Sequence, residues 1–228
     1  MSQLNQRLVF RNAVKSMVKA GVDPRTAILS QSYLRLERIV NTSVTNYQFG
    51  VLVSDTPQGS TVQTTEQRLN LQDSFFVSSV QMFVGLQTAN YTSTNFPLYP
   101  YPNPHVFSGG INTSSSTANQ LWNAYNSFLS LTVNNRTIAT AWDTFRHYDA
   151  RTTQQNVAIT ATAGTLDEMS GANSTSYSVE PNWVLIGSKN NVLTLNMPGA
   201  IANIEASATT KIVLILRGVL AQNSTVVS

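Results

Sequence analysis

The chain of 228 residues contains no cysteine and little charge, since Lys, Arg, Asp and Glu together make up 11% of it. Without cysteine it can form neither a disulfide scaffold nor a thiolate metal site. Its two histidines are too few for a typical structural zinc site. About a quarter of a typical soluble domain is charged, so this surface must be solubilised in another way.

Uncharged polar residues take the place of the missing charge. Asn, Ser, Thr and Gln number 22, 25, 26 and 14, which gives 87 residues against 25 charged ones. Charge normally keeps neighbouring copies of a soluble protein apart. A surface of amides and hydroxyls with so few ions therefore favours packing against copies of the same chain.

Long apolar runs and the common catalytic motifs are also missing. No run approaches the roughly 18 apolar residues that span a bilayer, and no apolar segment typical of a secretory signal follows the first seven residues. The sequence contains no GxGxxG, GxxxxGK[ST], HExxH or GxSxG motif. We therefore expect a soluble chain made in the cytoplasm that is not an enzyme and that holds no cofactor or metal.

The positive charge is concentrated at the N-terminus. Residues 1–38 carry seven positive and two negative residues, a net charge of +5, whereas residues 39–228 carry seven and nine, a net charge of −2. Four of the cations are spaced four residues apart: Arg7, Arg11, Lys15 and Lys19. On a helix this spacing places them in one row.

The apolar residues of the same segment predict an amphipathic helix over residues 4–19. They form two adjacent rows at i, i+4 spacing, which are Val9, Ala13, Met17 and Phe10, Val14, Val18. The row of cations beside them could lie on anionic lipid or neutralise the phosphates of packaged nucleic acid. It could also be the solvated edge of a helix that docks on its own β domain or on a neighbour, and the spacing does not distinguish between these possibilities.

From Tyr33 onward the hydrophobic period changes from 3.6 to 2, which predicts strands. The second half continues in β-branched and aromatic segments, without the intervening helices of βαβ units, so the fold class is all-β, a sandwich or barrel. Residues 211–220, KIVLILRGVL, lack alternation in their middle and predict a central strand covered on both faces. Asn134 and Asn135 predict a turn.

A proline-rich stretch separates two comparable halves of the β sequence. It has four prolines in eight positions, residues 97–104, and is followed by a Gly, Ser and Thr tract. Domain boundaries usually lie in such sequence. We therefore predict a basic helical arm over residues 1–32, a first β-sandwich over 33–110 and a second over 111–228, with one elaborated sandwich as the alternative.

The same proline-rich stretch is a candidate partner-binding loop. A polyproline II conformation would present Tyr99, Tyr101 and His105 at low entropic cost to a receptor, a glycan or a neighbouring subunit. The alternative interpretation is a stiff loop that covers the end of a sandwich.

The best local cluster of polar residues is WDTFRHYDAR, with Asp143, Arg146, His147, Asp149 and Arg151. Asp143, His147 and Asp149 could form a carboxylate and histidine pair for proton transfer, as in a hydrolase, or half of a metal site. We favour the simpler interpretation, in which these alternating residues are solvated at a strand end or pair across a subunit contact.

Taken in order, these features resemble the jelly-roll capsid proteins of tailless icosahedral bacteriophages. They are a basic amphipathic helix, an all-β body rich in Asn, Ser and Thr, and long Pro/Gly-rich excursions, without cysteine or a catalytic signature. The resemblance is greatest to the small double-barrel major coat proteins of phages with an internal membrane. Residues 65–87, TEQRLNLQDSFFVSSVQMFVGLQ, are also similar to phage virion proteins.

The resemblance implies a jelly-roll β-sandwich, two small ones in tandem, in a major capsid protein that self-assembles into an icosahedral shell. Its partners would be copies of itself, as a trimer or larger in a shell lattice, and other virion proteins. The N-terminal arm would face an internal membrane or the genome through Arg7, Arg11, Lys15 and Lys19, and the protein would be located in the virion. The alternative is a receptor- or glycan-binding spike or decoration protein, which would use Tyr99, Tyr101 and His105.

Overall fold

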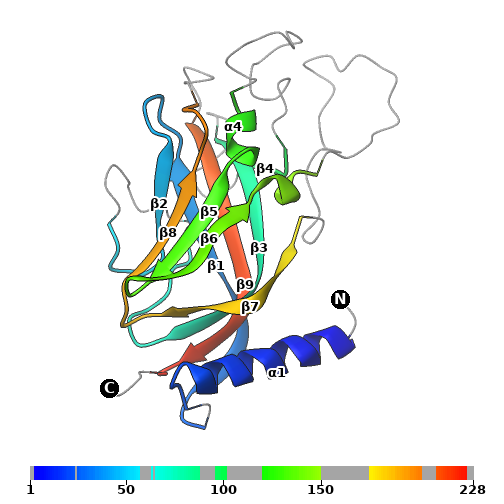
Figure 1. Cartoon of the computed structure of the whole chain (residues 1–228), viewed down its shortest axis with the longest axis vertical. Helices are drawn as coiled ribbons and strands as arrows, with labels where there is room; N and C mark the ends of the chain where they lie inside the picture. The colour runs from blue at the N-terminus through cyan, green and yellow to red at the C-terminus, as the bar shows by residue number, and fades with distance from the viewer. Residues whose placement is uncertain are drawn as a thin grey trace.

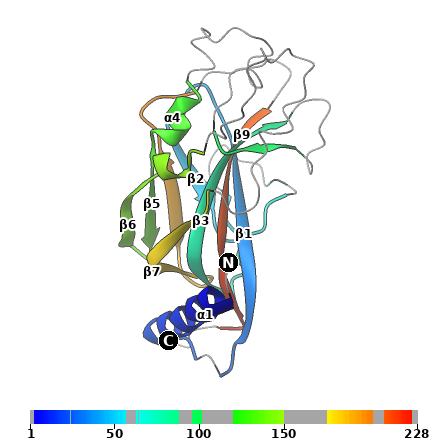
Figure 2. The same ribbon diagram turned by 90° about the vertical axis from the view of Figure 1, so that its right-hand side faces the viewer.

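The computed structural model describes residues 3–23, 25–56, 63, 65–87, 96–101, 120–149, 175–201 and 209–224, with side chains from residue 7 onward. These residues form two antiparallel β-sheets that face each other, with one long helix across one end (Figures 1 and 2). The prediction of an all-β body behind an N-terminal helix is confirmed.

The first sheet begins with the strands β1 (Ile28–Ile39), β9 (Thr209–Gln222) and β3 (Ser74–Gln87), in that order. Two more strands pair with the other side of β3, namely β7 (Tyr177–Ile186) and the short β4 (Leu98–Tyr99). The second sheet has the order β2 (Asn46–Gly50), β8 (Asn191–Asn196), β5 (Phe128–Val133), β6 (Arg136–Asp143). The helical elements are α1 (Gln3–Lys19), the single turn α4 (Trp122–Tyr125) and the 3₁₀ turn η1 (Phe145–His147).

The strands pair in a nested order. The first pairs with the last, β1 with β9; inside that pair β2 pairs with β8, then β3 with β7, and finally β5 with β6. Successive pairs alternate between the two sheets. The chain therefore follows one long antiparallel hairpin that is wound around itself, with β4 added at the edge.

The predicted division into sandwiches at residue 110 does not match this pairing. Each sheet combines strands from both predicted halves, so the described strands form one sandwich, which was the alternative. The proline-rich stretch was a misleading boundary signal because strands before it pair with strands after it, as β1 does with β9. The arm predicted over residues 1–32 also ends earlier, since β1 already begins at Ile28.

The main apolar core lies between the two sheets. Leu36, Val80 and Leu214 of the first sheet are buried against Phe49 and Leu195 of the second within one cluster. Burial of apolar side chains at about 25 cal/mol per Å² is the principal stabilising contribution to such a core. This core holds the sheets together and leaves the outer face of the first sheet available for α1.

Candidate functional site

Helix α1 lies across one end of the sandwich, which we call the base (Figure 1). Its buried side chains, Ala13 and Met17, contact a patch formed by Phe76 of β3 and Val219 and Ala221 of β9. These three residues lie on the outer face of the first sheet, so α1 docks on its own β body. The buried residues belong to one of the two apolar rows expected from the sequence.

The four predicted cations occupy the opposite side of α1. The side chains of Arg7, Arg11, Lys15 and Lys19 are all exposed. At about 100° per residue, this row is centred roughly opposite Ala13 and Met17. No ion pair among the described residues involves any of the four, so their charges face solvent.

The outward side of α1 is also apolar, which the sequence analysis missed. Leu8 is 49% exposed and Val18 is 60% exposed, and at 100° per residue both lie within the arc of the cations. Phe10 is exposed as well, although it lies closer to the side of Met17. Phe10 and Val18 were expected in the docking stripe, but both are exposed, and the helix contributes only Ala13 and Met17 to the buried cluster.

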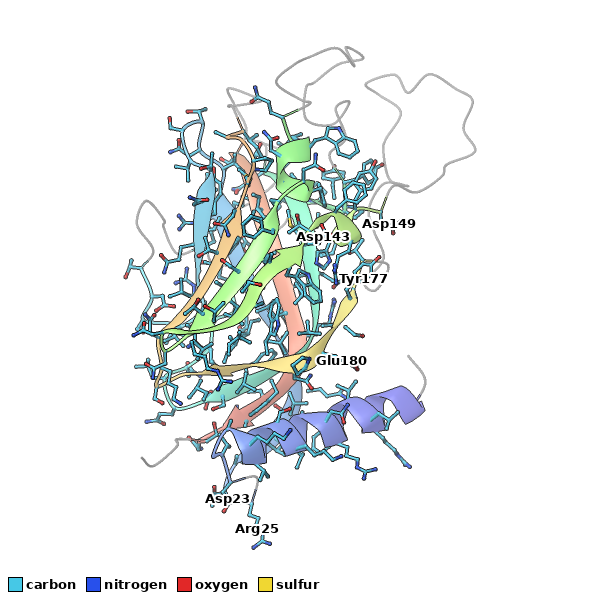
Figure 3. All side chains as sticks on the ribbon, in the orientation of Figure 1. Asp23, Arg25, Asp143, Asp149, Tyr177 and Glu180 are labelled. Carbon is cyan, nitrogen blue, oxygen red and sulfur yellow. The ribbon has the colours of Figure 1, made fainter. Side chains whose placement is uncertain are left out.

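One further cation lies at the base. Arg25 projects from the turn after α1, next to Asp23, whose Oδ1 accepts the Arg25 backbone N–H at 2.9 Å (Figure 3). The exposed Arg25 therefore adds one cation beyond those of the helix, with an acidic neighbour beside it.

Charges in the upper part of the first sheet are internal instead. The Glu37 carboxylate is buried and accepts bonds from Arg35 Nε at 2.8 Å, from the Thr65 hydroxyl and from Lys211 Nζ at 3.3 Å. A second buried pair joins Arg68 Nη2 to Glu66 Oε2 at 2.8 Å. These ions fix residues 65–68 against β1 and are not presented to a partner.

The cluster around His147 forms part of the sandwich structure. Its Nε2 accepts the Trp142 indole N–H at 3.0 Å, and its Nδ1 lies 3.0 Å from the Thr175 carbonyl, to which it donates. The ring is buried, and burial lowers its pKa to about 4, partly opposed by the bond to Thr175. Both ring nitrogens are thus engaged away from a carboxylate.

The carboxylates predicted beside His147 do not contact it. Asp143 is exposed and its Oδ1 accepts the Phe145 N–H at 2.9 Å, while the Asp149 N–H donates to the Pro100 carbonyl at 3.2 Å. Arg146 stacks on Trp142, with its Cζ 4.2 Å from the ring centroid, and Arg151 lies outside the described residues. In the part of the chain that the structure describes, no group of three His, Cys, Asp or Glu could hold a metal ion.

The predicted partner-binding loop is described only in part. Tyr99 is buried in β4, and its carbonyl accepts the Tyr125 hydroxyl at 3.0 Å. Tyr101 is half-buried and packs edge-to-face on Tyr148, with ring centroids 6.1 Å apart. His105 lies outside the described residues. Tyr99 and Tyr101 thus contact the body of the sandwich.

Comparison of the chain with protein-family models, with curated proteins and with solved structures found no match. Among the helices in the described ranges, none combines the length and apolarity needed to cross a membrane. The candidate functional site is the outward face of α1, with its four exposed cations and the exposed Leu8 and Val18.

Proposed function

We propose that this chain is a structural virion protein, a major capsid protein that assembles into an icosahedral shell and turns its base toward the interior. The nested strand order supports a jelly roll, since that architecture consists of two sheets of four strands wound as Greek keys and is used by viral capsid domains. The low charge of the chain supports close packing of many copies. The protein would be made in the host cytoplasm and located in the virion.

The observation that carries the proposal is the outward face of α1. A helix that only completes its own domain needs one apolar side, and α1 already buries that side against β3 and β9. Its opposite side carries four free cations together with Leu8 and Val18. This second amphipathic side supports contact between the base and a large anionic surface.

Lipid is the partner that this face favours over packaged nucleic acid. Phosphate neutralisation requires only cations, whereas a helix in a membrane interface also inserts apolar side chains between the headgroups. The exposed Leu8 and Val18 side chains can insert between lipid headgroups, whereas the phosphates of a nucleic acid offer them no apolar contact. The internal membrane of a virion is accordingly the proposed partner of α1.

A vesicle experiment tests the partner. Replacement of Arg7, Arg11, Lys15 and Lys19 by Gln should weaken binding to anionic vesicles about a thousandfold, at about 1 kcal/mol for each cation. Leu8→Ser with Val18→Ser should weaken vesicle binding but leave binding to duplex DNA unchanged. Arg146→Gln, an exposed cation outside the base, is the control. Equal loss of DNA and vesicle binding in the Ser variant would reject lipid as the partner.

Electron microscopy of the purified chain tests the capsid role. We expect closed particles or an extended lattice, because a shell protein pairs with copies of itself on several sides. A spike or decoration protein would give a small oligomer of defined size. Normal assembly of the variant with four Gln residues on lipid would remove the proposed role of α1.

A further inference from the structure

The lower half of β1 is an edge to which no strand pairs within the described residues. β1 is the outermost strand of the first sheet, and residues 28–34, with the sequence ILSQSYL, contain neither a charge nor a proline (Figure 2). Natural edge strands are normally blunted by Lys, Pro, a bulge or a covering segment, because free N–H and C=O groups pair readily with another strand. The pairing of β1 with β9 has no bulge.

The direction of the free backbone groups follows from the upper half of β1. The Arg35 N–H donates to the Gln67 carbonyl at 3.0 Å, the Gln67 N–H donates to the Arg35 carbonyl at 2.9 Å, and the Glu37 N–H donates to Glu66 Oε1 at 2.9 Å. The backbone N–H and C=O groups of the odd-numbered residues of β1 therefore point away from β9. The alternation of a regular strand gives Leu29, Gln31 and Tyr33 the same direction, and no residue in the described ranges bonds to these outward groups.

The segment of residues 65–68, which we call the strap, covers this edge only from Arg35 upward. Below the strap, Ser30 and Gln31 are exposed and Tyr33 is 50% exposed. The accessible edge is thus short. Its centre is Gln31, because the residues whose backbone groups point outward are Leu29, Gln31 and Tyr33.

We propose that this edge pairs with the same edge of a second copy of the chain. The two β1 strands would run antiparallel about a two-fold axis through Gln31, so that the first sheets of two copies become continuous. Gln31 would then lie opposite Gln31, and Leu29 opposite Tyr33. Each of the three residues donates and accepts one backbone bond, which gives six bonds across the axis.

The side chains of this register suit a second copy rather than an unrelated partner. A residue on the axis meets its own kind, and Gln31 is uncharged, so no like charges face each other. Leu29 opposite Tyr33 is an apolar and aromatic pair, and Ser30 opposite Ser32 is a hydroxyl pair, both of which stabilise antiparallel strands. The strap prevents an extension of the pairing to Arg35, because the Arg35 groups are already bonded to Gln67.

This contact gives one specific interface to the self-assembly proposed above, but it does not depend on a shell. A pair of edges of this length makes a weak dimer, since association has a large entropic cost. Particles without this contact, or dimers without particles, would separate the two proposals experimentally.

Cysteine crosslinking tests the register directly, because the chain has no cysteine of its own. In a hydrogen-bonded antiparallel pair the facing Cα atoms lie about 5.5 Å apart, within the range of a disulfide. Gln31→Cys should therefore form covalent dimers on mild oxidation. Tyr33→Cys is the matched control on the same exposed edge, since its two copies would lie roughly 13 Å apart along the strands. Equal crosslinking of the two variants would overturn the proposal.

Charge substitution at the axis gives an independent test that does not alter the backbone. Gln31→Lys and Gln31→Glu should each weaken self-association about tenfold, as measured by sedimentation at high concentration. An equimolar mixture of the two variants should restore it.

Gln31→Pro removes a backbone N–H that points away from β9, and should weaken association about tenfold to a hundredfold by the loss of two bonds. Unchanged association of all three variants would exclude the β1 edge as the interface.

Discussion

Acidification should destabilise the fold through His147. Its pKa is lowered to about 4 by burial, against an ordinary 6.5 in an unfolded chain. Between these two values the unfolded state binds a proton that the folded state does not bind, so the free energy of unfolding falls as the pH falls. Over the whole interval from pH 6.5 to 4 the loss is about 3 kcal/mol.

The measurement is urea unfolding of the full chain at several pH values between 7 and 4, followed by tryptophan fluorescence. His147→Gln is the matched variant, because its amide can accept the Trp142 N–H and donate to the Thr175 carbonyl without titrating. The wild type should lose about 3 kcal/mol more than the variant across this interval. Parallel pH dependences for the two proteins would refute the argument that His147 is held neutral by burial. The ring-proton NMR signals of the two histidines give a direct check, since one of them should titrate near pH 4.

Three further substitutions test the packing. Lys211→Met should cost about 3 kcal/mol because it leaves the buried Glu37 carboxylate without its ammonium partner, and addition of Glu37→Gln should recover much of this loss in denaturation experiments. Gly218→Ala should cost about 3 kcal/mol in the same assay, since a Cβ there would lie 1.9 Å from the Phe76 backbone oxygen. Asn135→Val should lower the unfolding free energy by about 1–2 kcal/mol, because residue 135 has φ 64° and a β-branched side chain is strained in that region. An unchanged denaturation midpoint in any of these experiments would contradict the ion pair, the close approach or the backbone strain on which that prediction rests.

The elements that sequence analysis predicts well are those whose signal is local. The i, i+4 rows predicted a helix over 4–19, and α1 spans Gln3–Lys19. The unbroken apolar run at 211–220 predicted a central strand, and β9 lies between β1 and β3. Asn134 and Asn135 both have positive φ in the turn between β5 and β6, as expected for a two-residue hairpin loop.

The features that could not be predicted depend on distant partners. A strand pattern reveals its own period but not the strand with which it pairs, so nothing in residues 28–39 indicated pairing with residues 211–222. The same limit applies to Glu37 and Lys211, which form an ion pair only because the first strand β1 pairs with the last strand β9. The exposure of Val18 depends on which side of α1 packs on β3 and β9, and the helix sequence does not contain that information.

The distribution of charge connects these features to the proposed role. Around Glu37 and Lys211, ions are paired inside the first sheet, where solvent screening is weak. On α1 the four cations are exposed and form no ion pair with any residue in the described ranges, so their charge is available to an anionic surface. Copies can approach along an uncharged edge such as ILSQSYL without repulsion while the cations all act at one end. Placing Lys on the β1 edge and removing the cations of α1 should therefore impair different steps, association of copies in the first case and attachment of the base in the second.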